Sequence, residues 1–552
     1  MPAATPAEGK RAPGAARRLA PNRFRILCPN RTKAVLFHKR MKGGEKMPSS
    51  FPVLGLIVAL PLAFLIVLAA VPARSVGAIR TLGLLGSAAP AGLAFYALTR
   101  FDLTGGGWQF REGARWFTLW MPSFDVASHG WQLVPLPIDG TLAVDGLSLP
   151  LLFMATFVGF MAALASWTVT HRPKAYWMFV LLLNAGMNGA FAATNLLLFF
   201  VFFELTLVAL FFLVGIWGGE ARERAAYQLL LYNGLGSLIM LAVFLLLFHL
   251  TGSFDVSTVA ERLGERALPG WLVTGTFLAL VVAFGIKLPI VPFHTWVLNV
   301  HPVASAPMSM ILSGVLLKIG GYGLIRFGVG FFPEEVRRWA PLLAVFGLIN
   351  LLYGAFLALQ EGELKRLIAY SSISHMGLVL FGLAAANEEG LSGAVFQMVS
   401  HGFISALLFL VAGVIAERTG TARLAELGGL WQPMPLASGV LLVGALASLG
   451  LPAFSGFVAE LLTYLGLFKS GQGVIAVLGA FGLVLSAAYL LRGALTAGWG
   501  PVPERAKALT DARPVEIVPM LLLVAAILWI GVYPFVLGEA MKASIGALVA
   551  RL

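Results

Sequence analysis

Long apolar runs recur along most of the chain, and this feature limits the possible folds more than any other. An α-helix needs about 20 apolar residues to cross the hydrocarbon core of a bilayer. Charges, Pro or Gly separate about 14 runs of suitable length. They lie near residues 51–72, 79–100, 147–169, 175–193, 195–217, 225–250, 271–298, 306–328, 339–359, 365–386, 391–416, 436–468, 473–496 and 515–538. The sequence therefore predicts an all-α polytopic membrane protein.

Composition excludes a water-soluble globule. Of the 552 residues, 59% are apolar and 12% are charged, whereas soluble domains usually carry about 25% charged residues. The formal charge of +13 comes mostly from residues 1–46, which contain 12 Lys or Arg and two Glu. The single cysteine, Cys28, cannot form a disulfide within the chain or a four-thiolate site for an iron–sulfur cluster. Any electron transfer must therefore occur in another chain.

We divide the chain into four parts on these patterns. The division is a basic disordered arm or mis-assigned start at 1–46, two N-terminal helices with an outer loop at 47–146, a core at 147–500 and a C-terminal transmembrane helix at 501–552. Within the second part, residues 101–146 are too polar to span a membrane. We expect this loop to form a cap of short strands or turns on the outer face.

The basic arm has two interpretations. It is rich in Arg, Pro, Ala and Gly, which is typical of a disordered or targeting segment. Alternatively, it is upstream sequence and translation starts at Met47, immediately before the first apolar run. By the positive-inside rule, the loop charges of the body place both termini outside the cytoplasm, which conflicts with a basic arm and favours Met47. A peptide from residues 1–46 in mass spectra of the purified protein would contradict this hypothesis.

Six ionisable residues lie inside apolar runs, where contact with lipid would cost several kcal/mol. They are Glu204, Lys287, Lys318, His375, His401 and Glu460. Such residues usually face the interior of a helix bundle and mark an ion path. We expect Lys287 to contact Glu204, because a nearby anion stabilises a buried cation. A purely structural role stays open for each residue, above all for the two histidines.

The first predicted helix break follows Lys287. Pro289 and Pro292 each remove a backbone donor there and interrupt the helix at membrane depth. Broken helices line cavities in transporters, and a buried lysine can exchange its proton near physiological pH. His294 and His301 follow the break and are secondary candidates, expected at the polar end of the helix.

The second predicted break precedes Glu460. Glycine and proline interrupt an apolar run at 450–456. The two breaks lie about 170 residues apart, as expected of a transporter built from two repeats. If the segments 174–328 and 339–496 each hold five spans, the second repeat must be inverted relative to the first.

Several familiar enzyme motifs are absent from the sequence. It contains no Walker motif, no strand-flanked GxGxxG, no HExxH and no Ser/His/Asp arrangement. Hydrolytic or nucleotide-driven chemistry is therefore not predicted for this chain.

Dense motifs around these residues resemble the antiporter-like subunits of respiratory complex I, the NADH-quinone oxidoreductase. The motifs are FFELTLVALFFLVGIWGG (202–219), GIKLPIVPFHTW (285–296), ASAPMSMILSGVLLKIGGYGLIRFG (304–328), LKRLIAYSSISHMG (364–377), QMVSHG (397–402) and LPAFSGFVAELL (451–462). The resemblance covers roughly residues 140–500. It departs from the family at LNVHPVAS (298–305) and in the basic arm.

The resemblance implies a fourteen-helix fold with two inverted five-helix repeats, a broken helix in each and a central polar axis. All six ionisable residues named above match proton-path positions of the family. A glutamate at position 460 is typical of the M-type subunits, because the L-type and N-type subunits and the D subunits of sodium/proton antiporters usually have lysine there.

The resemblance also implies a function and partners. The chain would translocate protons in the cytoplasmic membrane as part of a proton-pumping NADH:quinone oxidoreductase, beside other membrane-arm subunits that include the L-type and N-type ones. It would bind no cofactor itself, since NADH, FMN, iron–sulfur clusters and quinone belong to other subunits. The alternative is a D subunit of a multi-subunit sodium/proton antiporter. A mere scaffold is disfavoured, because buried ion pairs are a poor source of stability.

Overall fold

The computed structural model describes residues 51–125 and 130–552. The predictions for residues 1–46 and for a start at Met47 lie outside the described residues. In the described part, 13 helices are long and apolar enough to cross a membrane. The predicted class, an all-α polytopic membrane protein, is therefore confirmed.

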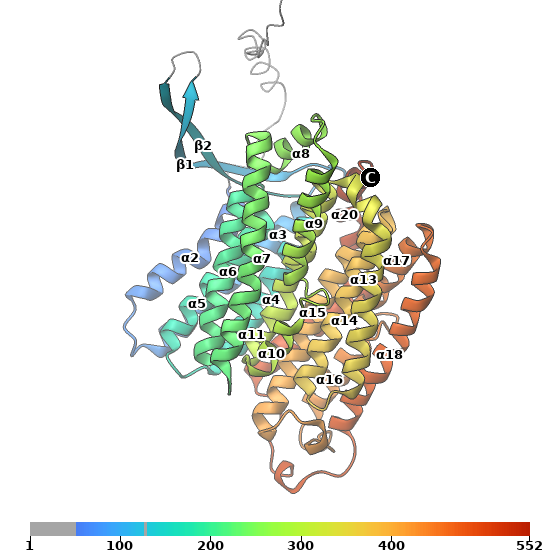
Figure 1. Cartoon of the computed structure of the whole chain (residues 1–552). Coiled ribbons are helices and arrows are strands. Elements are labelled where there is room, and N and C mark those ends of the chain that lie inside the picture. The colour runs from blue at the N-terminus through green and yellow to red at the C-terminus, as the bar shows by residue number, and fades with distance from the viewer. Residues whose placement is uncertain (1–50, 126–129) are drawn as a thin grey trace, which may run out of the picture. The chain divides into compact units, whose positions relative to one another are not determined.

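Successive spans run in opposite directions and pack side by side (Figure 1). The uninterrupted α-helical spans are α2 (Val53–Ala70), α3 (Val76–Arg100), α4 (Ser148–Ala165), α5 (Pro173–Ala192), α6 (Leu196–Trp217), α7 (Arg222–Thr251), α9 (Gly270–Lys287), α13 (Pro333–Gln360), α14 (Leu364–Ala385), α15 (Glu388–Thr419), α18 (Gly473–Gly498) and α19 (Pro514–Val532). A further span, Ala306–Val329, consists of α11 (Ala306–Ile311), a π-helical segment (Leu312–Leu316), α12 (Leu317–Gly323) and a second π-helical segment (Leu324–Val329).

The predicted span at 436–468 is two shorter helices, α16 (Pro435–Ser448) and α17 (Ser455–Lys469). Similarly, the predicted span at 271–298 ends early at Lys287, and α10 (Thr295–Val303) continues it after a non-helical stretch. Both predicted helix breaks are thus present in the structure. The chain also forms α20 (Phe535–Val549) after the last predicted span, a helix that the sequence analysis missed.

The loop at 101–146 forms a cap over one end of the helix bundle. The helix α8 (Val256–Gly264) and the C-terminus lie at the same end (Figure 1). Two antiparallel strands build the cap, β1 (Gln109–Asp125) and β2 (Gly130–Val144), so the strands are longer than the predicted short ones. The Glu112 carboxylate accepts hydrogen bonds from the backbone N–H groups of Leu54 and Gly55, at 2.8 and 2.7 Å. These bonds satisfy orphan donors at the start of α2 and join the cap to that helix.

A side chain from another span satisfies the backbone at the first break. The Asn350 amide, on α13, accepts a hydrogen bond from the Val291 N–H at 2.8 Å and donates one to the Pro289 carbonyl at 3.1 Å. The Trp296 indole N–H donates to the carbonyl of Ile286, at the end of α9, at 3.0 Å. Because unpaired backbone groups are costly at membrane depth, these contacts fix the position of the break.

The breaks occupy equivalent places in the order of the spans. Counting from α5 and from α13, each segment has five spans and the broken helix is the fourth of them. With an odd number of spans per segment, the second segment starts at the opposite end of the bundle from the first. Inverted repeats require such opposite starting ends. That the two segments are inverted repeats of one another stays a prediction.

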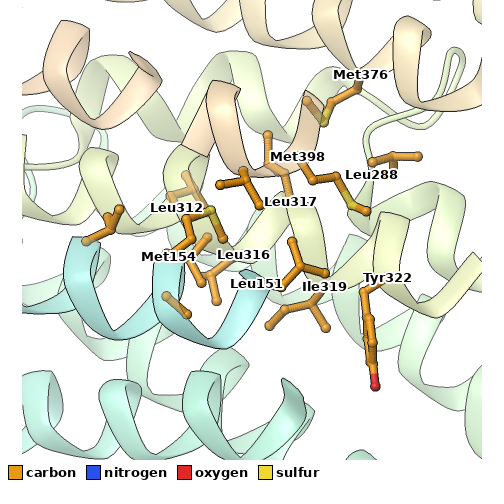
Figure 2. Close-up of a cluster of buried hydrophobic side chains, with 14 of the residues drawn as sticks. Leu151, Met154, Leu288, Leu312, Leu316, Leu317, Ile319, Tyr322, Met376 and Met398 are labelled. Atoms are coloured by element: carbon orange, nitrogen blue, oxygen red, sulfur yellow. The ribbon is translucent and has the colours of Figure 1, made fainter. Parts of the chain in front are cut away.

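Three spans are enclosed almost completely by protein. In the most apolar 18-residue windows of Ala306–Val329, α14 and α15, between 94% and 100% of the residues are buried, against 33% in α2. Around the first of these spans, Figure 2 shows Leu316, Leu317 and Ile319 packed among side chains of α4, α14 and α15. The three enclosed spans form the core that any central site must occupy.

Gly320 permits the close approach of α12 to the end of α9. A Cβ atom on this residue would lie 2.7 Å from the Leu288 backbone nitrogen and 2.8 Å from the Phe284 carbonyl oxygen. Both neighbours are backbone atoms and cannot rotate away. The small residue therefore sets the spacing between the helix that ends at Lys287 and the helix that carries Lys318.

We expect Gly320→Ala to lower the stability of the protein by about 1–3 kcal/mol, because the added methyl group forces these two helices apart. The measurement is the thermal unfolding midpoint of the purified protein in detergent. Gly275→Ala is the matched control, since a Cβ at Gly275 on α9 would meet nothing within 4 Å. Equal midpoints for the two variants would contradict the assigned role of Gly320.

Candidate functional site

Lys318 is fully buried at the centre of its span and has polar partners on two sides. Its ammonium donates a hydrogen bond to the Ser313 carbonyl and lies 2.7 Å from Nδ1 of His401. Ser313 belongs to the π-helical segment just before α12, where the wider turn changes the direction of the backbone carbonyls. Both residues are buried, and their spans are enclosed by protein, so the lysine and histidine meet in an interior shielded from lipid.

His375 continues the row beyond His401. The two rings lie 5.4 Å apart, centroid to centroid. Nδ1 of His375 lies 2.7 Å from the Ser371 carbonyl oxygen, and Nε2 lies 2.9 Å from that of Ser448, at the end of α16. Because carbonyl oxygens accept hydrogen bonds, the ring can carry a proton on either nitrogen, or on both, with an acceptor in place. His375 is thus suited to pass a proton through its ring.

Glu460 is the next ionisable group. Its Oε1 lies 3.9 Å from Nε2 of His375, and the residue is 6% exposed. The carboxylate packs against Gly450, whose φ of +76° belongs to the left-handed region that favours glycine. A Cβ at Gly450 would lie 2.1 Å from Oε2 of Glu460. The second break thus leaves the space in which this carboxyl group sits.

Together these contacts form one buried row of four residues, which we call the central row: Lys318, His401, His375 and Glu460. Each residue comes from a different element, namely α12, α15, α14 and α17. The row therefore crosses from the first segment of five spans into the second. Groups at these separations can exchange protons directly or through one intervening water.

Lys287 and Glu204 stand apart from the central row. Within the described chain, Lys287 makes no ion pair with Glu204 at 4.0 Å or less, although the two charges interact electrostatically. The Lys287 ammonium instead lies 4.7 Å from the centroid of the Phe203 ring. Oε1 of Glu204 is buried without a hydrogen-bond partner. The expected direct contact is not made, because the aromatic face occupies the position beside the ammonium.

His294 and His301 lie at the two ends of α10, as its N-cap residue and in its last turn, and both side chains are buried. The His294 ring lies edge-on to Tyr353, with centroids 5.0 Å apart. His301 stacks on Phe409 at 4.2 Å. Packing of α10 against its neighbours turns both rings inward, which the order of residues along the chain does not reveal.

A cavity of about 390 Å³ lies beyond His301, at the end of the bundle opposite the cap. Ser305, Lys365, Glu417 and Glu516 contribute polar groups to its lining. His301 stacks on Phe409, the neighbour in sequence of Leu410 in the cavity lining, and both Lys365 and Lys318 act electrostatically on it. The sequence analysis did not single out Lys365, although a lysine at the start of an apolar span was a usable signal.

Two other contributions were missed in the sequence. Asn350, which holds the first break, is an amide in the apolar middle of α13. Asp145 and Arg326 form a buried ion pair at 2.6 Å. Arg326 lies in the same apolar span as Lys318, so its charge was as clear a signal as that of the lysine. In the part of the chain that the structure describes, His, Cys, Asp and Glu do not gather into a group of three or more suited to a metal ion.

The fold and the central row define a class of protein: a polytopic membrane protein with a broken helix in each of two five-span segments and a buried acid–base axis joining them. Residues 193–486 match the family model described as NADH:quinone oxidoreductase/Mrp antiporter, TM. The chain belongs to this family.

Relatives of known name agree with this assignment. The chain is 41% identical over 471 residues to "NAD(P)H-quinone oxidoreductase chain 4 1" of Synechococcus sp. strain JA-3-3Ab, covering 80% of this chain and 89% of the relative. A protein of the same name from Picosynechococcus sp. strain PCC 7002 is 43% identical over 427 residues, covering 76% of this chain and 80% of the relative.

Solved structures show the same fold. A chain of respiratory complex I from Thermus thermophilus with bound NADH aligns with a TM-score of 0.77 at 29% identity, covering 90% of this chain and 99% of that chain. A chain of the Mrp complex from Dietzia sp. DQ12-45-1b has the same TM-score of 0.77 at 22% identity, covering 90% of this chain and 97% of that chain. The second likeness concerns the fold alone.

We predict that Gly450→Ala will disturb the site as strongly as a substitution of Glu460 itself, because the methyl group would occupy the place of the carboxylate. The measurement is the rate of proton translocation by the intact complex in membrane vesicles. Gly471→Ala is the control, since Gly471 has a similar φ of +82° but open space where the Cβ would lie. Equal losses in both variants would assign the effect to backbone strain and contradict the contact.

Proposed function

We propose that this chain is a membrane-arm subunit of an NAD(P)H-quinone oxidoreductase and that it moves protons across the cytoplasmic membrane. The observation that carries the proposal is the central row, which joins acid–base groups of both five-span segments inside the protein. Electron transfer to quinone occurs in partner subunits, which also hold NADH, FMN and the iron–sulfur clusters. This chain contributes the proton path.

The proposed path starts at the cavity beside Lys365 and His301 and reaches Lys318 at the centre of the bundle. From there the proton passes through His401 and His375 and leaves from Glu460 toward the side of the cap. By the positive-inside rule, the basic residues in the loops at the cavity end favour a cytoplasmic position for this end. Uptake from the cytoplasm and release outside follow from this orientation.

Lys287 and Glu204 adjust the path rather than carry the proton along it. Lys287 ends α9, which packs directly against α12 and therefore near the Lys318 segment. A charge at Lys287 disfavours a second charge at Lys318, and an approach to Glu204 would weaken that effect. A shift of the Glu204 side chain, driven by a neighbouring subunit, would thus change the proton affinity of Lys318.

The oxidoreductase is favoured over the sodium/proton antiporter by two observations. Relatives at about 40% identity carry the name NAD(P)H-quinone oxidoreductase chain 4, whereas the Mrp complex shares 22% identity and the fold. Position 460 is a glutamate, as in the M-type subunits that the sequence resembles.

The first experiment identifies the partners. The complex that contains this chain is purified in mild detergent and its subunits are identified by mass spectrometry. We expect flavin and iron–sulfur subunits together with other antiporter-like membrane subunits. A complex made only of small membrane subunits would contradict the oxidoreductase and assign the same residues to cation exchange.

We predict that Lys318→Met will slow proton transfer through this chain by about 100-fold or more, the contribution typical of a positioned acid–base group. Proton uptake and quinone reduction are measured separately in vesicles supplied with NADH. Lys542→Met, the same change at an exposed position on α20, serves as the control and should pump normally. Normal pumping by Lys318→Met would remove Lys318 from the path.

The contact between Lys318 and His401 also predicts that their effects are not additive. A Lys318→Met, His401→Gln double variant should pump little worse than the more impaired single variant, because either change interrupts the same step. Additive losses would contradict a shared step. Full pumping by Lys287→Ala or Glu204→Ala variants that assemble normally would remove these two residues from the mechanism.

A further inference from the structure

The span that carries Lys318 ends in a second buried cation. Arg326 lies eight residues further along, about 12 Å nearer the cap at the rise of an α-helix. Its guanidinium forms the 2.6 Å ion pair with Asp145, and the two side chains are 7% and 9% exposed. The pair therefore lies between the central row and the outer face, on the cap side of Lys318.

Contacts from several elements hold Arg326 in one position. Its Nε donates a hydrogen bond to the Tyr322 hydroxyl at 3.2 Å, and its guanidinium carbon lies 4.5 Å from the centroid of the Trp108 ring. The Trp108 indole N–H donates to the hydroxyl of Ser257 on α8, at 3.0 Å. Two parts of the cap, the segment before β1 and α8, are thus fastened over the arginine.

Asp145 is equally constrained. Its carboxylate accepts hydrogen bonds from the backbone N–H groups of Leu147 and Ser148, at 3.1 and 3.0 Å, at the start of α4. Burial alone would raise the pKa of Asp145, but the charge and hydrogen bond of Arg326 outweigh that effect and hold this pKa below its ordinary value. The pair thus presents an arginine that is permanently charged and cannot swing aside.

Stability is a weak explanation for such a pair, because the desolvation of two charges can exceed their mutual attraction. Membrane pores, in contrast, use fixed arginines to exclude protons and other cations from a narrow passage. A proton leaving Lys318 straight toward the cap would have to pass this guanidinium. The position and fixed charge of Arg326 therefore suit a barrier to protons that would move from Lys318 toward the cap.

The second five-span segment has an arginine in a comparable place. Arg492 lies near the end of α18, the fifth span of that segment, as Arg326 lies near the end of the fifth span of the first. It donates hydrogen bonds to the carbonyls of Ala358 and Glu361, at 3.2 and 2.5 Å. Because the two spans run in opposite directions, Arg492 lies at the cavity end and Arg326 at the cap end.

We propose that Arg326, fixed by Asp145, is an electrostatic barrier that closes the cap end of the first segment, so that a proton on Lys318 leaves only sideways to His401. This inference rests on the proposed function, since it assumes that Lys318 carries a transported proton. Arg326 is a positioning residue in this scheme: it directs the proton and never takes it up.

The test measures passive proton entry into membrane vesicles that contain the assembled complex, driven by a potassium diffusion potential in the absence of NADH. The main variant is Arg326→Met with Asp145→Asn, which removes both charges and leaves no carboxylate unpaired. Arg326→Lys retains the positive charge. Arg115→Gln is the control, because Arg115 is an exposed cap residue whose ion pair with Asp139 measures 3.9 Å.

We expect the double variant to admit protons several-fold faster than the wild type. The proton entry rates of Arg326→Lys and Arg115→Gln should stay close to the wild-type rate. Adding Lys318→Met to the double variant should abolish the leak, because the leak passes through that lysine. Wild-type leak rates in an assembled double variant would overturn the barrier. A leak that persists without Lys318 would overturn it as well, since it would reflect general loosening of the fold.

NADH-driven pumping in the same vesicles separates this inference from the proposed function. If wild-type vesicles pump and the double variant does not leak, the barrier fails and the proposed function stands. If wild-type vesicles reduce quinone without any uptake of protons through this chain, the proposed function fails, whatever the leak assay shows.

Discussion

The structure depends on satisfying the Lys318 ammonium in an interior that protein encloses on all sides. Its own span meets this constraint through the Ser313 carbonyl, which lies in a π-helical segment, and α15 does so through His401 at 2.7 Å. The spans that supply these groups are also the most enclosed ones. A packing arrangement that stabilises a buried cation thus brings that cation into contact with a group that can exchange its proton.

The two helix breaks solve the same problem by different chemistry. At the first, the neutral amide of Asn350 pairs the backbone groups that the prolines leave free, and this amide cannot titrate. At the second, the partner of the Ser448 carbonyl is His375, and Glu460 lies 3.9 Å from the same ring nitrogen. The charge of Glu460 therefore acts on the same ring nitrogen that contacts the end of α16, whereas the amide at the first break carries no charge.

Much of this arrangement could be predicted from the sequence, because each signal lay in a short stretch of chain. Apolar runs predicted the spans, and Pro289 and Pro292 predicted the first break. Ionisable residues within apolar runs identified the candidate site. Their roles in proton transfer stay predictions. What could not be predicted is set by contacts between distant segments. Asp145 and Arg326 are 181 residues apart, and hydropathy does not fix the rotation of a helix that turns His301 inward.

The proposed path depends on the opposite orientation of the two five-span segments. A straight path through either segment would leak, because one lysine or one carboxyl group would then be open to both faces of the membrane. Inversion places the fixed arginine of the first segment at the cap end and that of the second at the cavity end. In the proposed path, the ends without a fixed arginine face opposite sides of the membrane, and the histidines of α14 and α15 join them. Transport then requires a lateral step from Lys318 to His401. A partner subunit can control this step through the charges of the groups beside it.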